Sequence, residues 1–177
     1  MKKHVIILTG PESSGKSVLS EALSQKYDGL WIPEYARAYV ENLNRDYTYS
    51  DVEHIARIQV KEYEDAIKSE KEWLFFDTSL IITKIWFTYI FNKYPTWLDD
   101  AIEQMQVDLF LLCKPDLPWV ADGVREHENK RQELFVLYKK ELERYNKKYN
   151  IVSGEAETRF QCAINHINQA INLRDDQ

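Results

Sequence analysis

The chain has 177 residues, enough to bury a hydrophobic core without disulfides or metal staples, and we expect a single domain over residues 1–177. Hydrophobic residues make up 44% and charged residues 29%, with only five glycines and five prolines, which excludes a disordered or low-complexity chain. The formal net charge of −6 argues against an extended nucleic-acid footprint, which requires clustered Lys and Arg.

The first element is an apolar and β-branched run, His4–Thr9, which predicts a strand buried on both faces. A helix is predicted from Ser17 to Tyr27. Between them lies the pattern G-x-x-x-x-G-K-[ST], here Gly10-Pro11-Glu12-Ser13-Ser14-Gly15-Lys16-Ser17. The glycines let backbone N–H groups turn toward phosphate oxygens, the lysine reaches the β/γ-phosphates, and the serine hydroxyl binds Mg²⁺. Strand, loop and helix N-terminus together predict that Gly10 to Val18 bind a nucleoside triphosphate.

The rest of the first half alternates short strands with helices. The predicted strands are Leu30–Pro33 and Trp73–Phe76, the second ending at Asp77. The predicted helices are Glu34–Leu43, Val52–Glu70 with Ser50 or Asp51 as its cap, Leu80–Tyr94, and Trp97–Met105.

The second half continues this alternation. Asp108–Cys113 is a predicted strand, and the charged segment with two prolines that follows predicts a loop or lid at about 114–131. The remaining elements are a helix with a buried stripe from Leu134 to Tyr145, a strand at Asn150–Val152, and a last helix lined by Phe160 to Ile171.

This order of elements predicts an α/β fold with a doubly wound, five-stranded parallel sheet flanked by helices. Ligands of such sheets bind at the carboxyl ends of the strands. Gly10, Glu34 and Asp77 all fall at such ends.

Three further features bear on partners and location. The helix at Leu80–Tyr94 is apolar almost all round, which predicts burial or a partner subunit, and we hypothesise a homodimer. Cys113 and Cys162 lack Cys-x-x-Cys spacing and predict reduced thiols. The apolar run before Gly10 is too short for a signal peptide, and no stretch approaches a membrane span, so we expect a cytoplasmic protein.

Two carboxylates are candidates for the chemistry. Asp77 closes an apolar strand, where a carboxylate can lie near Mg²⁺ together with Ser17. Asp77 or Glu34 can also act as the base that accepts a hydroxyl proton. The alternatives are that Asp77 caps the next helix and that Glu34 is a first-turn acid favoured by the helix dipole.

Two residues beside Glu34 are candidate substrate contacts. Arg37 lies one helical turn further on, so the two side chains either form a salt bridge or point jointly into the substrate pocket. Tyr35 offers a ring on which a base or pyridine can stack, with simple core packing as the alternative.

The predicted lid supplies Arg125, and Arg131 follows it. Arginines brought in by a closing lid stabilise the charge on a phosphoryl group in transfer while excluding water. The alternative is a pair of solvated surface arginines. Asp122 can bind Arg125 or touch a substrate hydroxyl.

Four motifs together resemble the ribosylnicotinamide kinase domain of the NadR family over nearly the whole chain. They are Thr9-Gly-Pro-Glu-Ser-Ser-Gly-Lys-Ser17, Pro33-Glu-Tyr-Ala-Arg37, Phe76-Asp-Thr78, and Trp119-Val-Ala-Asp-Gly-Val-Arg125. The resemblance implies a kinase that uses ATP and Mg²⁺ to phosphorylate the ribose 5′-hydroxyl of nicotinamide riboside for NAD salvage. In that case Trp119 and Asp122 bind substrate, and Lys16, Asp77, Glu34, Arg125 and Arg131 act in catalysis.

The chain also departs from the family pattern. Ser79 and Ala121 stand where commoner forms of two of these motifs carry an acid. Longer members place an adenylyltransferase domain before the kinase, whereas here the first strand begins at His4, and we expect no such domain. The competing functions are a deoxynucleoside or nucleotide kinase and a nucleotide-dependent regulatory ATPase without a small-molecule acceptor.

Overall fold

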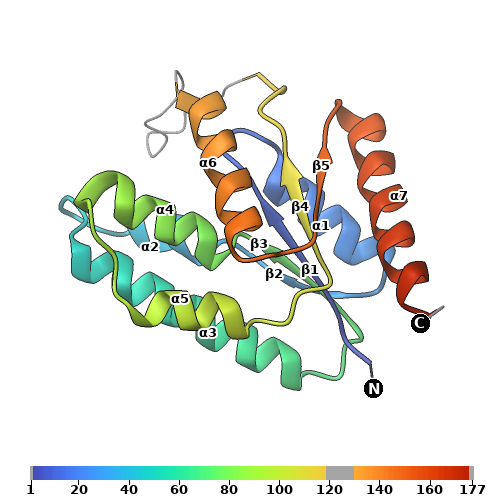
Figure 1. Cartoon of the computed structure of the whole chain (residues 1–177), viewed down its shortest axis with the longest axis horizontal. Helices are drawn as coiled ribbons and strands as arrows, with labels where there is room; N and C mark the ends of the chain where they lie inside the picture. The colour runs from blue at the N-terminus through green and yellow to red at the C-terminus, as the bar shows by residue number, and fades with distance from the viewer. Residues whose placement is uncertain (1, 119–129, 176–177) are drawn as a thin grey trace.

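A computed structural model describes residues 2–118 and 130–175. Its centre is a five-stranded parallel sheet in the order β2-β3-β1-β4-β5 (Figure 1). The strands are β1 His4–Thr9, β2 Leu30–Ile32, β3 Trp73–Asp77, β4 Leu109–Cys113 and β5 Tyr149–Val152. The helices are α1 Lys16–Lys26, α2 Tyr35–Glu41, α3 Tyr49–Lys68, α4 Leu80–Phe91, α5 Trp97–Gln104, α6 Arg131–Arg144 and α7 Ala156–Asp175. The predicted doubly wound α/β fold is confirmed.

The two faces of the sheet carry separate hydrophobic clusters, because alternate residues of a strand point to opposite faces. Val5 and Ile7 of β1 pack under α3 to α6, and Ile6 and Leu8 pack under α1 and α7. Figure 1 shows the same division of the helices into two layers. Since both faces are covered, every residue of β1 is buried, as its continuous apolar sequence predicts.

The strand order decides where the motifs meet. β1 lies between β3 and β4, and β3 lies between β1 and β2. The carboxyl ends of β1, β3 and β2 are therefore neighbours at one edge of the sheet. Gly10, Asp77 and Glu34, each at or just after one of these ends, come together there.

Several helix boundaries differ from the predicted ones by one to three residues, and two of these differences have a clear local cause. α3 begins earlier because Thr48, and not Ser50 or Asp51, is its N-cap; Asp51 is the third helical residue and completes a capping box with Thr48. α4 stops at Phe91 because Asn92 takes a left-handed conformation with φ of 52°.

The apolar character of α4 is explained by burial on two sides. Ile81 and Phe87 face the core beneath α3, whereas Trp86 and Tyr89 line a pocket. This confirms burial, the first of the two alternatives for this helix. The homodimer stays a prediction.

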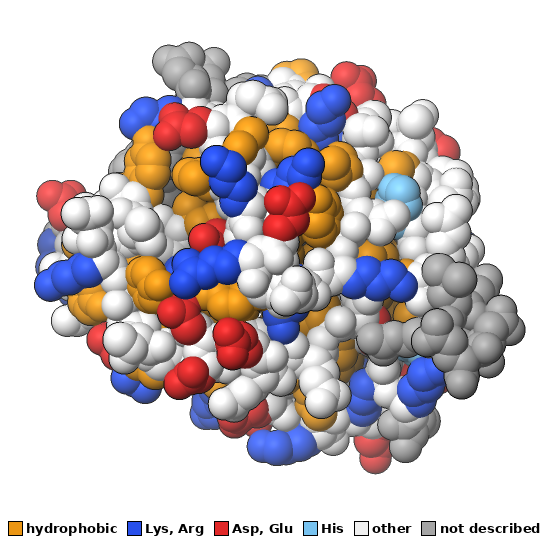
Figure 2. Space-filling model, viewed as in Figure 1, with side chains coloured by type: hydrophobic (Ala, Val, Ile, Leu, Met, Phe, Trp, Pro, Cys, Tyr) orange, Lys and Arg blue, Asp and Glu red, His pale blue; other side chains and the backbone are white. Residues whose placement is uncertain are grey.

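Figure 2 shows acidic and basic side chains interspersed over the face formed by α3 to α6.

Within residues 2–118 and 130–175, no helix combines the length and the apolar sequence that a membrane crossing requires.

A buried lysine ties three helices together under this face. Lys84 of α4 is 2% exposed, and its Nζ lies 2.8 Å from Glu141 of α6 and 3.1 Å from Asp99 of α5. It also donates to the Tyr145 hydroxyl at 2.6 Å, and this hydroxyl donates to Asp99. Burial opposes the charge of Lys84, but these hydrogen bonds outweigh burial and raise its pKa.

We predict that Lys84→Met destabilises the fold by about 3 kcal/mol, because it leaves two carboxylates without their shared cation. Urea unfolding followed by circular dichroism measures this. The matched control is Lys61→Met on the exposed side of α3, which we expect to change stability by less than about 0.5 kcal/mol. Equal unfolding midpoints for the two variants would contradict the prediction.

Candidate active site

The loop between β1 and α1 is shaped by two close approaches. Gly10 has φ of 136° and Gly15 has φ of 76°, both in the region that disfavours other residues. A β-carbon on Gly10 would lie 2.6 Å from the carbonyl oxygen of Cys113, and one on Gly15 would lie 2.9 Å from Leu117 Cδ1. Gly10 is therefore required by space as well as by conformation, because it meets backbone, whereas Gly15 is required mainly by conformation, because the Leu117 side chain could shift.

Lys16 lies across this loop. Its Nζ donates to the carbonyl oxygens of Gly10 and Pro11, each at 2.9 Å, and Ser14 Oγ donates to the Pro11 carbonyl at 2.7 Å. Lys16 also lines a pocket that reaches from this loop to α2, α3, α4 and α6. The ammonium group is thus placed at the junction of loop and pocket.

Asp77 lies beside Ser17 at the end of β3. Its side chain is 3% exposed, and Oδ1 has no hydrogen-bond partner among the described residues. Burial raises the pKa of Asp77, and the charge of Lys16 and a hydrogen bond with Ser17 act in the opposite direction. The structure does not make Asp77 a helix cap, since Ser79 is the N-cap of α4.

Ser17 and Asp77 form a donor set that fits Mg²⁺. A hydroxyl and a carboxylate with an orphaned buried oxygen are hard oxygen ligands, which this ion prefers. The described residues contain no cluster of three or more His, Cys, Asp or Glu side chains that could enclose a metal. A site of few protein ligands suits Mg²⁺, which keeps waters and takes phosphate oxygens for its remaining positions.

The backbone next to Asp77 is strained. Thr78 has φ of 110°, an unfavourable value for a β-branched residue, and its N–H donates to the Leu8 carbonyl at 3.1 Å. The hydroxyls of Thr78 and Ser79 are buried and find no hydrogen-bond partner in the part of the chain that the structure describes. Strain and unmet polar groups together are typical of a functional position.

The pocket begins at the loop between β1 and α1 and extends into the space between α2, α3, α4 and α6. Its end near the loop carries Lys16, Glu34 and Arg37, and Gln59 and Thr83 are polar groups deeper in its wall. Aromatic side chains form much of the remaining wall: Tyr47, Trp86, Tyr89 and Tyr138. Charged groups at one end and rings along the walls suit a ligand with a polar part and a flat ring.

Both arrangements predicted for Glu34 and Arg37, a salt bridge and a joint orientation toward the pocket, occur in the structure. Arg37 Nη2 lies 3.4 Å from Glu34 Oε2, and both residues line the pocket. The salt bridge and the shared orientation toward the pocket therefore occur together.

The sequence did not predict the aromatic wall of the pocket, and it missed two pocket residues as candidates. Gln59 accepts a hydrogen bond at Oε1 from Thr83 Oγ1 at 2.7 Å, and its buried Nε2 has no partner among the described residues. The signal was a single glutamine interrupting the apolar stripe of α3. Tyr138 was assigned to the core of α6; it is buried, which raises its pKa, and Glu12 and Glu34 act in the same direction.

Two predicted ligand contacts lie outside the main pocket. Tyr35 lines a smaller pocket that also includes Asp77, and its hydroxyl is 3.2 Å from Nε2 of His54. Val18 is 76% exposed at the start of α1. Their roles stay predictions.

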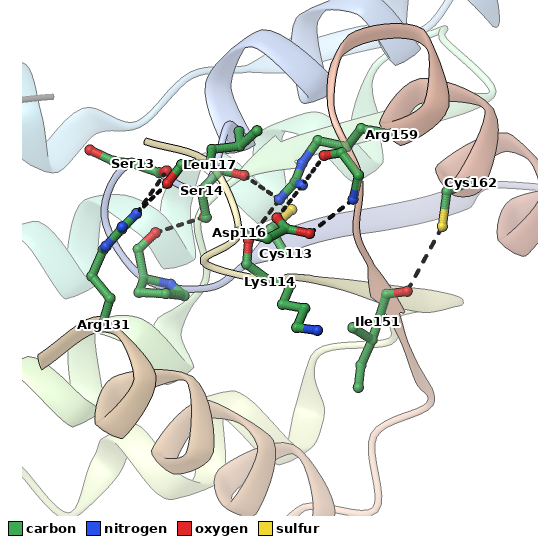
Figure 3. A network of polar contacts seen from close by, with 12 residues as sticks. Ser13, Ser14, Cys113, Lys114, Asp116, Leu117, Arg131, Ile151, Arg159 and Cys162 are labelled. Atoms are coloured by element: carbon green, nitrogen blue, oxygen red, sulfur yellow. Dashed lines mark hydrogen bonds and ion pairs between the residues drawn. The ribbon is translucent and has the colours of Figure 1, made fainter. Parts of the chain in front are cut away.

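Of the predicted arginines, the structure places Arg131. It lies at the start of α6 and donates to the Leu117 carbonyl at 2.9 Å and to the Ser13 carbonyl at 3.4 Å (Figure 3). It thus touches the phosphate loop. The predicted site residues Trp119, Asp122 and Arg125 lie outside the described residues.

Residues 5–159 match the family described as AAA domain. This chain belongs to the AAA-domain family. Its P-loop, Gly10 to Ser17, is the nucleotide-binding feature that the sequence predicted.

Two curated relatives of this AAA-domain chain carry the description trifunctional NAD biosynthesis/regulator protein NadR. The protein from Escherichia coli (strain K12) is 30% identical over 126 residues, 69% of this chain and 31% of the relative. The protein from Salmonella typhimurium (strain LT2) is 31% identical over the same shares. The matched part is therefore about a third of the length of these relatives. The resemblance to NadR in the motifs is confirmed.

Solved structures with this P-loop fold include NadR and a nucleoside kinase. A crystal structure of NadR protein in complex with NR has a TM-score of 0.84 and 23% identity, covering 95% of this chain and 51% of that one. A structure of deoxyadenosine kinase from M. mycoides has a TM-score of 0.67 and 16% identity, covering 96% and 100%. At these identities the likeness shows the fold.

We predict that Asp77→Asn unfolds at an equal or higher temperature than the wild type at pH 7.5. The folded-state pKa of Asp77 is raised, so its charge opposes folding above the unfolded pKa of about 4, fully so above the folded pKa. Melting followed by circular dichroism, from pH 7.5 downward, should show the difference shrinking as both states become protonated.

The matched control is Asp100→Asn, at an exposed position of α5, which should not change the melting temperature. A lower melting temperature for Asp77→Asn at pH 7.5 would mean that the bonds of the carboxylate outweigh its burial.

Proposed function

We propose that the protein is a kinase that uses ATP and Mg²⁺ to phosphorylate the ribose 5′-hydroxyl of nicotinamide riboside, giving nicotinamide mononucleotide. The observation that carries the proposal is the pocket that starts at Lys16 of the P-loop and continues between aromatic walls. The similarity to NadR supports a pyridine riboside as the acceptor.

The P-loop side of the pocket would hold ATP. Backbone N–H groups of residues 12–17 and the Lys16 ammonium would bind the phosphates, because both are placed at the loop. Mg²⁺, held by Ser17 and Asp77, would neutralise phosphate charge. Arg131, which already touches the loop at Ser13, is close enough to share in this role.

The other side of the pocket would hold the riboside. Glu34 lines the pocket, whereas Asp77 is buried beside Ser17, and this division favours Glu34 as the base and Asp77 as the metal ligand. Glu34 would accept the proton of the 5′-hydroxyl while this oxygen forms a bond to the γ-phosphorus and the bond from that phosphorus to the bridging oxygen breaks, releasing ADP. The aromatic wall, which includes Trp86 and Tyr89, would hold the pyridine ring.

A deoxynucleoside kinase is the second candidate. The fold match to deoxyadenosine kinase favours it, since the same architecture supports that acceptor class. A regulatory ATPase is the third, and it would have no use for an aromatic acceptor pocket.

We predict that ATP turnover in the presence of Mg²⁺ rises with nicotinamide riboside and not with uridine, thymidine or deoxyadenosine. Lys16→Met and Asp77→Asn should each lower this turnover by about 100-fold or more, because the first removes a cation that would bind the phosphates and the second a charged ligand of Mg²⁺. Coupled detection of ADP and chromatography of the phosphorylated product measure both.

The controls are Lys61→Met and Asp100→Asn, exposed residues of the same types away from the pocket, which should keep full turnover. Turnover that prefers deoxyadenosine would support the deoxynucleoside kinase. ATP hydrolysis that no acceptor changes would support the regulatory ATPase.

We predict that Gln59→Leu raises the KM for nicotinamide riboside by about 10-fold to 100-fold. The buried Nε2 of Gln59 is a donor without a described partner in the wall of the pocket, and it would bind an acceptor such as the carboxamide oxygen. The KM for ATP should stay within about twofold, because Gln59 is not part of the P-loop.

The matched control is Gln169→Leu on the exposed side of α7. Steady-state kinetics with each substrate varied in turn separates the two constants. An unchanged riboside KM in Gln59→Leu would exclude this glutamine from acceptor binding.

A further inference from the structure

Arg159 is a buried arginine behind the P-loop, and the proposed phosphoryl transfer gives it no role. It lies in the first turn of α7 and is 3% exposed. A buried guanidinium is costly unless hydrogen bonds satisfy it. Its contacts therefore indicate what keeps it there.

The guanidinium joins three segments that are distant in sequence (Figure 3). Arg159 Nη2 donates to the Ser14 carbonyl at 2.7 Å and to the Lys114 carbonyl at 2.8 Å. Nη1 donates to Asp116 Oδ1 and to the Gly154 carbonyl, each at 2.7 Å. Arg159 thus ties the P-loop to the segment after β4 and to the turn after β5.

Arg131 makes a parallel connection. It joins the Ser13 carbonyl of the P-loop to the Leu117 carbonyl, and Arg159 joins the Ser14 carbonyl to that of Lys114. Two consecutive P-loop carbonyls are therefore each held by an arginine that also holds the 114–117 segment.

Fixing these carbonyls fixes the N–H groups of the loop. In a planar trans peptide the C=O and the following N–H point in opposite directions. An arginine that holds the Ser14 carbonyl therefore directs the N–H of Gly15 to the opposite side of the loop. Loop N–H groups oriented before the ligand arrives are what a phosphate cradle requires.

Asp116 forms an ion pair with Arg159 and balances the charge of the guanidinium. Asp116 also accepts a hydrogen bond at Oδ2 from the Gly154 N–H at 2.9 Å. Burial opposes the charge of Asp116, but this N–H and the Arg159 guanidinium outweigh burial and lower its pKa. The ion pair is neutral as a whole, so its effect on a bound phosphate is through geometry.

We infer that Arg159, held by Asp116, is a positioning residue that keeps the P-loop in the conformation that binds ATP. It acts through the Ser14 carbonyl and does not touch the nucleotide phosphates. This inference rests on the nucleotide-binding half of the proposed function and is independent of the acceptor.

The test is the affinity for ATP in the presence of Mg²⁺, measured by titration calorimetry at 10 °C without any acceptor. We expect Arg159→Gln to weaken ATP binding by about 10-fold to 100-fold, since it loses several charge-assisted bonds. Arg159→Lys should recover only part of the affinity, because one ammonium cannot span the acceptors that a planar guanidinium reaches.

Two further variants separate positioning from loss of stability. Lys84→Met removes another buried cation, which pairs with Asp99 and Glu141 and not with the P-loop, and it should destabilise the fold without changing ATP affinity. Asp116→Asn keeps the side-chain volume and the backbone bonds of Arg159, and we expect it to weaken ATP binding by about threefold to tenfold. If the Arg159 variants do not fold, the ATP affinity of Asp116→Asn tests the inference.

Three outcomes have distinct meanings. ATP affinity lost in the Arg159 and Asp116 variants and kept in Lys84→Met supports the inference. Variants at Arg159 or Asp116 that bind ATP as tightly as Lys84→Met overturn the inference and leave the proposed kinase intact. Wild-type protein that does not bind ATP overturns both.

Discussion

The backbone of Gly10 passes so close to β4 that a β-carbon there would lie 2.6 Å from the Cys113 carbonyl oxygen. This approach is possible because β1 and β4 are parallel neighbours and the chain turns sharply where β1 ends. The P-loop therefore bends back over the end of the sheet, beside the segment that follows β4. Lys16, Ser17 and the loop N–H groups depend on this turn for their positions, and so does the contact of Arg159 with Ser14.

The charges around this turn are arranged in two ways. Behind the loop, the two terminal nitrogens of Arg159 are matched by Asp116 and by backbone carbonyls, whereas its buried Nε has no partner among the described residues. In front of the loop, Asp77 is buried with one oxygen unsatisfied, and its pKa is raised. The first arrangement stabilises a conformation. The second leaves a buried carboxylate oxygen unsatisfied, at a cost in stability that is typical of functional sites.

The wall of the pocket depends on how α4 packs. This helix is apolar on nearly all sides because one side packs into the core and another, with Trp86 and Tyr89, lines the pocket. Lys84 on α4 connects it to α5 and α6 through buried ion pairs. A wall held by these ion pairs would offer a flat ring a preformed surface, which reduces the ordering cost of binding.

The sequence by itself determined the sheet, the P-loop and the acids at the strand ends, because apolar runs, glycine spacing and strand termini are local signals. It also showed the resemblance to NadR. Gln59, Tyr138 and Arg159 could not be assigned in this way: a lone glutamine in a stripe, a tyrosine in an apolar pattern and an arginine on a helix are ordinary locally. Only the tertiary structure decided that these side chains meet the pocket and the loop, because it brings α3, α6 and the first turn of α7 to the carboxyl ends of the strands.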